Sequence, residues 1–362
     1  MARNLLILRL NPIFITQIQQ PAMKLSLRLT AAVAAIIMSA VAALSAAETA
    51  GRIVVAYVTS SPDVMPDPTE MTHINYAFGH VNETFDGVTV DNPGRLTRIT
   101  ALKQRNPELK VLLSIGGWCS GRFSEMAATD STRRAFAADC RRVADTYGLD
   151  GIDIDWEYPT SSESGISSSP DDTENFTKLM RDLREALGPD RMLTMASVCS
   201  AKYVDFPAIL PYTDFINVMA YDMARVPLHS SPLYRSERTG TSADEATRAH
   251  LVAGVPREKI VLGLPFYGRG RAPYTDFIDF RDIRPFEGCT EEWDSVAMAP
   301  YMANSDGELV LGFDNPRSMT LKLDYILDNS LRGAMYWDYH CDDDAGTLRR
   351  LVARKILGRP QP

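Results

Sequence analysis

The sequence lacks several features that mark common classes of protein. Basic residues are not in excess, since 38 lysines and arginines face 46 acidic residues in 362, a formal net charge of −8. This balance argues against nucleic acid or an anionic membrane as the main partner, because both attract positive charge. With 45% apolar and 23% charged residues, the composition also excludes collagen-like, low-complexity and wholly disordered chains.

Recognisable metal-binding patterns are missing as well. The five cysteines are widely spaced with no CxxC pair, and the five histidines form no HxxxH pair. We therefore expect neither a metal nor a cofactor. An exported chain could form disulfides, but an odd number of cysteines leaves at least one thiol unpaired, and the spacing does not identify partners. The cysteines are Cys119, Cys140, Cys199, Cys289 and Cys341.

The first 47 residues contain no acidic side chain. From Met23 a short basic segment leads into an apolar alanine-rich stretch that ends in small residues. This layout predicts a secretory signal peptide over residues 1–47, with Met23 as the suspected true start and a secreted or periplasmic mature protein. An uncleaved membrane anchor is the alternative. Residues 1–47 carry four of the basic residues, so the remaining 315 residues have a net charge of −12.

Eight short apolar or β-branched runs alternate with segments of helical spacing. Several runs are apolar without alternation, as is typical of parallel strands that are buried on both faces. We predict an α/β fold, a (β/α)8 barrel. A doubly wound open sheet is the alternative, but no GxGxxG turn follows any run. The runs are 52–58, 73–78, 110–117, 150–156, 192–198, 215–221, 259–267 and 333–337.

Two connections carry further signals. After the fourth run, Asp171 and Glu174 offer a capping box, an apolar stripe follows, and Gly188 ends the predicted helix. The 62 residues from 271 to 332 exceed the length that one helix needs. We predict a short insertion over about 271–316, including a hairpin, within a single catalytic domain that spans 48–362.

The segment DGIDIDWEYP, residues 150–159, carries a row of acids. Alternate side chains of a strand share a face, so Asp153, Asp155 and Glu157 point one way and the apolar residues between them point the other. If the apolar face packs against helices, the three acids face the barrel interior. Ionised carboxyls in such a row repel one another, so the row requires shared protons or a cation.

Three interpretations of the row remain. It could be an acidic strand at an exposed sheet edge, or a site for a hard cation such as Ca²⁺. The third interpretation is acid catalysis, in which the inner acids raise the pKa of Glu157 so that it stays protonated near neutral pH. Glu157 lies at the carboxyl end of the row, where barrel strands present catalytic groups.

The row resembles the DxxDxDxE signature of glycoside hydrolase family 18, the chitinase family, and every acid of the signature is present. Other segments resemble motifs of the same family on successive strands, which makes chance an inadequate explanation. In chain order they are LLSIGGW (112–118), MAYDM (219–223), GLPFYGR (263–269) and GAMYWDYHCDD (333–343).

The resemblance implies roles for five polar residues. Glu157 would protonate the leaving oxygen and later activate water. Asp155 would hold the N–H of the substrate's 2-acetamido group, whose oxygen is the nucleophile in this family, and Asp153 would share a proton with Asp155. Tyr221 would donate its hydroxyl to the acetamido carbonyl, and Asp222 would contact sugar hydroxyls.

Aromatic side chains would provide platforms for the apolar faces of sugars. Trp337 would form the floor of the site, and Trp118 would form a platform on the leaving-group side. For each of these rings, packing in the core is the alternative. Weaker candidates for substrate binding are Met219, Tyr57, Phe78, Tyr267 and Arg269.

The implied activity is hydrolysis of β-1,4-linked N-acetylglucosamine polymers or oligomers with retention of configuration, by a protein expected to be a monomer. The short insertion implies a shallow cleft and non-processive, endo-type cleavage of soluble chains. Alternatives are an endo-β-N-acetylglucosaminidase acting on N-glycans, a non-catalytic carbohydrate-binding lectin and a metal-dependent hydrolase.

Overall fold

The computed structural model describes residues 51–359. The predicted signal peptide and the suspected start at Met23 lie outside these residues. Within the described part of the chain, no helix is both long and apolar enough to cross a bilayer.

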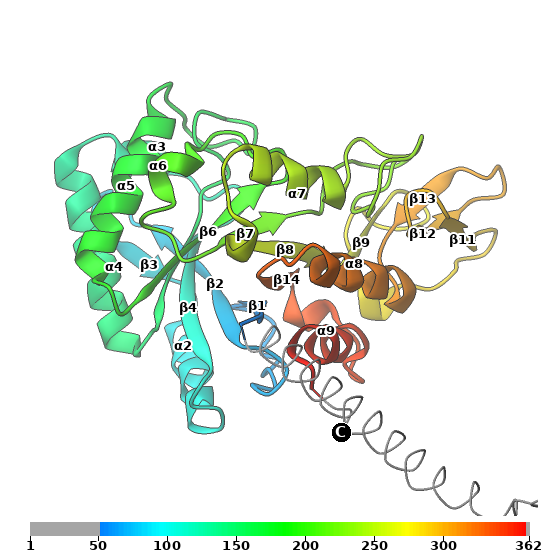
Figure 1. Ribbon diagram of the computed structural model, residues 1–362, viewed down its shortest axis with the longest axis horizontal. Coiled ribbons are helices and arrows are strands. Elements are labelled where there is room, and N and C mark those ends of the chain that lie inside the picture. The colour runs from blue at the N-terminus through cyan, green and yellow to red at the C-terminus, as the bar shows by residue number, and fades with distance from the viewer. Residues whose placement is uncertain (1–50, 360–362) are drawn as a thin grey trace, which may run out of the picture. The chain divides into compact units, whose positions relative to one another are not determined.

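Eight parallel strands form a closed barrel, which confirms the predicted fold (Figure 1). The barrel closes because the first strand pairs with both the second and the last. Each strand coincides with one of the eight predicted runs to within a few residues. The barrel strands are β1 (Ile53–Thr59), β2 (His73–Val81), β4 (Lys110–Gly116), β5 (Gly151–Asp155), β6 (Met192–Val198), β7 (Ile216–Met219), β8 (Ile260–Pro265) and β14 (Gly333–Trp337).

Helices cover the outside of the barrel, and a short strand, β3 (Val88–Val90), pairs antiparallel with β2. The apolar residues that point outward from the strands pack against the apolar stripes of these helices in one large core. The α-helices are α2 (Pro93–Thr100), α3 (Phe123–Ala127), α4 (Asp130–Tyr147), α5 (Asp172–Leu187), α6 (Phe206–Ile209), α7 (Ala243–Val252), α8 (Pro316–Asp328) and α9 (Thr347–Leu357).

The helix predicted after the fourth strand is α5, and Gly188 is its C-cap residue, as expected. The predicted capping box is wrong, because Asp171 makes no side-chain cap bond. The neighbouring Asp172 is buried instead, and it accepts hydrogen bonds from the Ser124 hydroxyl at 2.7 Å and the Ser169 N–H at 2.7 Å. The loop before α5 is therefore tied to Asp172.

The connection between β8 and α8 contains a five-stranded antiparallel sheet in the order β10-β9-β13-β12-β11. The predicted hairpin is present, because β12 and β13 pair across the turn at Gly307. The sheet begins at Tyr267 and has a small core of its own, which includes Leu311 and Phe313. Figure 1 shows it to one side of the barrel, beyond α8. Its strands are β9 (Tyr267–Gly270), β10 (Ile278–Asp279), β11 (Thr290–Asp294), β12 (Ala299–Ala303) and β13 (Leu309–Gly312).

Candidate active site

The acidic row lies on β5 with the predicted alternation. Ile152 and Ile154 are fully buried in the core between barrel and helices, and Trp156 stacks on Phe123 there at 5.3 Å between ring centroids. The acids of β5 therefore face the barrel interior, which excludes the alternative of an exposed acidic edge strand.

Asp153 lies deepest in the interior and is fully buried. One carboxylate oxygen accepts hydrogen bonds from the Tyr57 hydroxyl at 2.7 Å and the Ser114 hydroxyl at 2.8 Å. The other accepts from the Thr194 hydroxyl at 2.5 Å and the Asn217 amide at 3.2 Å. Burial raises the pKa of Asp153, and these bonds oppose that rise because they stabilise the charged form. Four donors therefore hold this carboxylate.

Asp155, two residues further along, lies in a different environment. Its Oδ1 atom is buried and has no hydrogen-bond partner among the described residues. Burial raises the pKa of Asp155 well above its ordinary value, and the charges of Glu157 and Asp153 raise it further. No hydrogen bond between described residues joins Asp153 to Asp155, and both oxygens of Asp153 accept from other donors. The raised pKa favours the protonated form of Asp155, and a proton shared between the two carboxyl groups stays a prediction.

Glu157 follows the end of β5 and is half-buried. Burial raises its pKa to about 7, the charge of Asp222 contributes to the rise, and the Tyr158 hydroxyl partly offsets it. A carboxyl group with this pKa is substantially protonated near neutral pH and can donate its proton in a reaction. The environment therefore suits Glu157 to general acid catalysis.

Glycines let the backbone approach the row closely. Gly116 has φ of +130°, and a Cβ there would lie 1.9 Å from the carbonyl oxygen of Asp155. Gly117 has φ of +93°, and a Cβ there would lie 2.8 Å from the Phe78 ring. The two glycines of the SIGG segment are thus required where the chain leaving β4 passes Asp155 of β5 and Phe78 of β2.

Tyr221 lies beyond the end of β7. Burial and the negative charges of Asp155 and Glu157 raise its pKa well above the ordinary value, so the phenol stays protonated and can donate. Among the described residues, its hydroxyl reaches only the Met335 sulfur, at 3.7 Å. A Cβ at position 263 would lie 2.9 Å from the Tyr221 ring, so Gly263 leaves room for that ring.

Asp222 forms a two-point ion pair with Arg269, with both N–O distances at 2.6 Å. The Arg269 guanidinium lies 5.2 Å from the ring centroids of Tyr267 and Phe277. The pair brings two of the predicted substrate-binding residues together, and it holds the negative charge of Asp222 in a fixed position beside Tyr267.

Trp337 is half-buried at the end of β14. It packs between Tyr57 at 5.6 Å and Phe78, on which it stacks at 5.6 Å and 21°. Tyr57 is 1% exposed and Tyr267 is 3% exposed. These two rings offer little free face to a sugar, and their contacts are those of supporting residues. Met219 is likewise buried in the cluster beneath Trp337.

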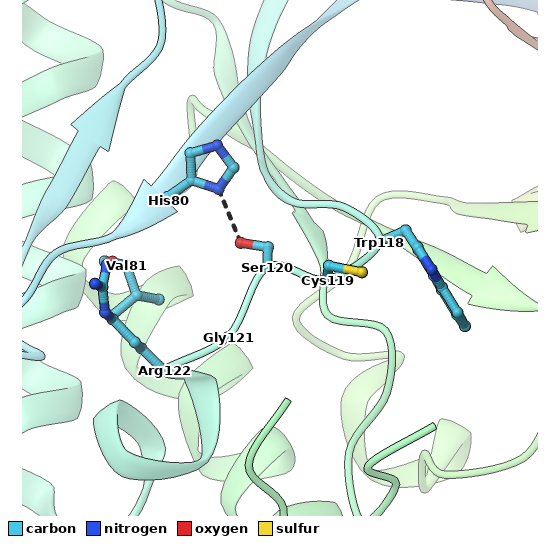
Figure 2. A pocket seen from close by; sticks show the side chains of 7 residues that line it. All are labelled: His80, Val81, Trp118, Cys119, Ser120, Gly121 and Arg122. Carbon is cyan, nitrogen blue, oxygen red and sulfur yellow. Dashed lines mark hydrogen bonds between the residues drawn. The ribbon is translucent and has the colours of Figure 1, made fainter. Parts of the chain in front are cut away.

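Trp118 is the most exposed of the predicted aromatic residues, at 56%. Beside it lies a pocket of about 510 Å³, in which the His80 ring accepts or donates a hydrogen bond with the Ser120 hydroxyl at 2.8 Å. Figure 2 shows the Trp118 ring directed away from this pair. The sequence does not predict this pair, because His80 lies on β2 and Ser120 lies in the loop after β4, so no local motif joins them. The lining residues are His80, Val81, Trp118, Cys119, Ser120, Gly121 and Arg122.

The sequence and the fold of this chain are both similar to those of known glycosidases. The family model described as glycosyl hydrolases family 18 matches residues 53–342. Chitinase A1 of Niallia circulans is 31% identical, and the match covers 82% of this chain and 56% of the relative. Chitotriosidase-1 of Mus musculus is 32% identical, and the match covers 78% of this chain and 69% of the relative. A solved family 18 N-acetylglucosaminidase from Paenibacillus barengoltzii has a TM-score of 0.76 and 34% identity, covering 84% of this chain and 99% of that one. The chain thus spans about half the length of Chitinase A1.

Proposed function

Since the chain belongs to the glycosyl hydrolases of family 18, we propose that it hydrolyses β-1,4 linkages between N-acetylglucosamine units in chitin and its oligosaccharides. The observation that carries this proposal is Glu157, a carboxyl group with a pKa of about 7 beside a buried, unpartnered Asp155. The names of the chitinase relatives support the substrate class.

The proposed reaction proceeds in two steps. The oxygen of the substrate's 2-acetamido group attacks the anomeric carbon, the glycosidic C–O bond breaks, and Glu157 gives its proton to the leaving oxygen. Water then attacks the same carbon, Glu157 takes up its proton, and the acetamido group is released from the cyclic oxazolinium intermediate. Two inversions at one carbon retain its configuration.

Asp155 and Tyr221 position the acetamido group in this proposal. The buried Oδ1 of Asp155 has no hydrogen-bond partner among the described residues and is free to accept the acetamido N–H. The Tyr221 hydroxyl remains a donor and would bond the acetamido oxygen. Orienting the internal nucleophile in this way lowers the entropic cost of attack. Asp153, held by its four donors, supplies a fixed negative charge behind Asp155.

The remaining predicted residues would bind the sugar chain. Trp337 would form the floor under the sugar that reacts, backed by Tyr57 and Phe78. The exposed Trp118 ring would contact a sugar on the leaving-group side, and Asp222, fixed by Arg269, would accept hydrogen bonds from sugar hydroxyls.

A Glu157→Gln variant tests the assignment. We expect hydrolysis of a chromogenic chitobioside to fall at least 1,000-fold, because the amide cannot donate the proton, while binding of chitotetraose persists. Glu163→Gln is the matched control, since Glu163 is exposed in the loop that follows β5. Wild-type turnover by Glu157→Gln would refute the catalytic assignment.

The N-acetylglucosaminidase from Paenibacillus barengoltzii supports a second candidate, the release of single N-acetylglucosamine units. Mass spectrometry of products from chitohexaose, colloidal chitin and an N-glycosylated protein distinguishes the candidates. Dimers and trimers from chitohexaose would support endo-type cleavage, monomers alone would support the second candidate, and cleavage restricted to the glycoprotein would support an endo-β-N-acetylglucosaminidase.

We also propose that residues 1–47 direct export and that the mature protein is a monomer. The acid-free N-terminal segment with its apolar stretch supports export. N-terminal sequencing of protein recovered from the medium or periplasm should begin at Glu48, and light scattering should give the mass of one mature chain.

A further inference from the structure

A cluster of three potential metal ligands lies outside the acidic row. Asp279 ends β10 of the five-stranded sheet, and His340 and Cys341 lie in the single 3₁₀ turn that follows β14. One donor atom of each residue lies within 4.8 Å of the others. The His340 Nε2 atom is 3.1 Å from one oxygen of Asp279, and the Cys341 Sγ atom is 3.4 Å from the other.

These separations are close to those in a tetrahedral zinc site. Bonds of about 2.0–2.3 Å to oxygen, nitrogen and sulfur at tetrahedral angles place the ligand atoms roughly 3.3–3.6 Å apart. The Cys341 Sγ atom is also 3.8 Å from Nδ1 of His340, so the sulfur lies beside the ring whose Nε2 atom faces Asp279. A small adjustment of the side chains would therefore seat an ion among the three donors.

Asp338 supports the cluster from behind. One of its oxygens accepts the backbone N–H of His340 at 2.9 Å and that of Cys341 at 3.2 Å, and it lies 3.0 Å from His340 Nδ1. Each ring nitrogen of His340 therefore faces a carboxylate. A histidine that binds metal through one nitrogen commonly donates its other N–H to a carboxylate, which fixes the ring orientation.

The cluster is accessible from one side. Cys341 is buried, whereas the side chains of His340 and Asp279 are 25% and 21% exposed. The Arg281 guanidinium lies 3.9 Å from Asp279, at the limit of an ion pair, and is itself partly exposed. An ion could enter past His340 and Asp279, and water could complete its coordination from that side.

We propose that Asp279, His340 and Cys341 form a structural zinc site. One sulfur, one nitrogen and one oxygen ligand with a water molecule suit Zn²⁺, whereas hard cations prefer oxygen alone. On binding, the thiol releases its proton and the thiolate bonds the metal. The site joins β10 of the five-stranded sheet to the turn directly after Trp337, and it takes no part in the proposed hydrolysis.

The test measures zinc binding by the full chain after EDTA treatment and dialysis. We expect one Zn²⁺ per chain by calorimetry and elemental analysis, a Tm that rises with zinc concentration, and a thiolate-to-cobalt charge-transfer band when Co²⁺ replaces Zn²⁺. Cys341→Ser should abolish the band and weaken binding at least tenfold. Cys119→Ser, the matched control at an exposed cysteine, should retain both.

Asp279→Asn and His340→Gln provide independent variants at partly exposed positions, in case Cys341→Ser fails to fold. Each should weaken zinc binding at least tenfold. Less than stoichiometric zinc in the wild type, or binding that all three variants retain, would overturn the proposal. None of these readouts depends on glycosidase activity, so the result is independent of the proposed function.

Discussion

Two aspartates of β5, at different depths in the barrel interior, have opposite hydrogen-bonding environments. In the deeper layer Asp153 accepts four hydrogen bonds from four different strands. In the layer above, Asp155 has a buried oxygen with no partner among the described residues, and burial and its acidic neighbours raise its pKa. The residue type and strand are the same, so the surrounding side chains determine which carboxyl is satisfied and which is left for a ligand.

This difference in hydrogen bonding indicates which aspartate stabilises the fold and which is available for catalysis. A buried carboxylate with a full set of donors is a structural element, because removing one donor leaves one of its oxygens less well satisfied in a low-dielectric interior. A buried carboxyl without donors destabilises the fold and persists where a ligand satisfies it. We therefore expect substitutions in the deeper layer to affect stability and substitutions in the upper layer to affect turnover.

The largest effect in this comparison is expected for Asp155→Asn. The amide has almost the same shape but, unlike the carboxyl group, cannot ionise to stabilise the positive oxazolinium intermediate, so kcat for chitotetraose should fall about 100-fold or more. The free energy of unfolding should be unchanged or slightly higher, because a buried acidic group is removed. Steady-state kinetics and urea denaturation measure the two quantities.

A large loss of stability in Asp155→Asn with near-normal turnover would contradict the division between the layers. The matched substitution Asp153→Asn should instead lower the free energy of unfolding clearly. The amide replaces one accepting oxygen by an NH₂ group, which would face the donors that now bind that oxygen.

An intermediate effect is expected for Tyr57→Phe. The change removes the hydroxyl that donates to Asp153 at 2.7 Å and should cost about 1–3 kcal/mol of stability. Tyr336→Phe is the matched control, because the buried Tyr336 hydroxyl has no partner among the described residues. Equal losses in the two variants, measured by urea denaturation, would show that the bond to Asp153 contributes nothing.

The smallest effect is expected for Trp118→Ala, at the exposed edge of the proposed site. The exposed ring lies outside both layers, so stability should not change, and KM for chitohexaose should rise roughly 3- to 10-fold with kcat nearly constant. Trp118→Phe should restore most of the affinity. A fall in kcat without a change in KM would place Trp118 in the chemical step.

The barrel could be predicted from the sequence because its signals are local. Eight apolar runs gave the eight strands, and the period of two within DGIDIDWEYP placed the acids on the inner face. Family membership was also predictable, since the motifs occur in chain order on or directly after five of the eight barrel strands. The roles of Glu157, Asp155, Asp153 and Tyr221 remain predictions that the experiments above test.

Features that depend on contacts between distant segments could not be predicted. Asp172, and not Asp171, accepts the hydrogen bonds at the start of α5, and this depends on how the preceding loop folds back. The four donors of Asp153 come from four strands, and no local pattern specifies them. Asp279 is 61 positions from His340 in the sequence, so spacing rules for metal ligands do not connect them.

The pH dependence of kcat/KM for chitotetraose tests the central claim most directly. Glu157 must be protonated to act, and its pKa in the folded protein is about 7. Activity should therefore be present below that pH and be lost as the pH rises through about 7, with a tenfold fall per unit above it. A rate that stays constant to about pH 9 in a protein that remains folded would contradict the assignment of Glu157 as the proton donor.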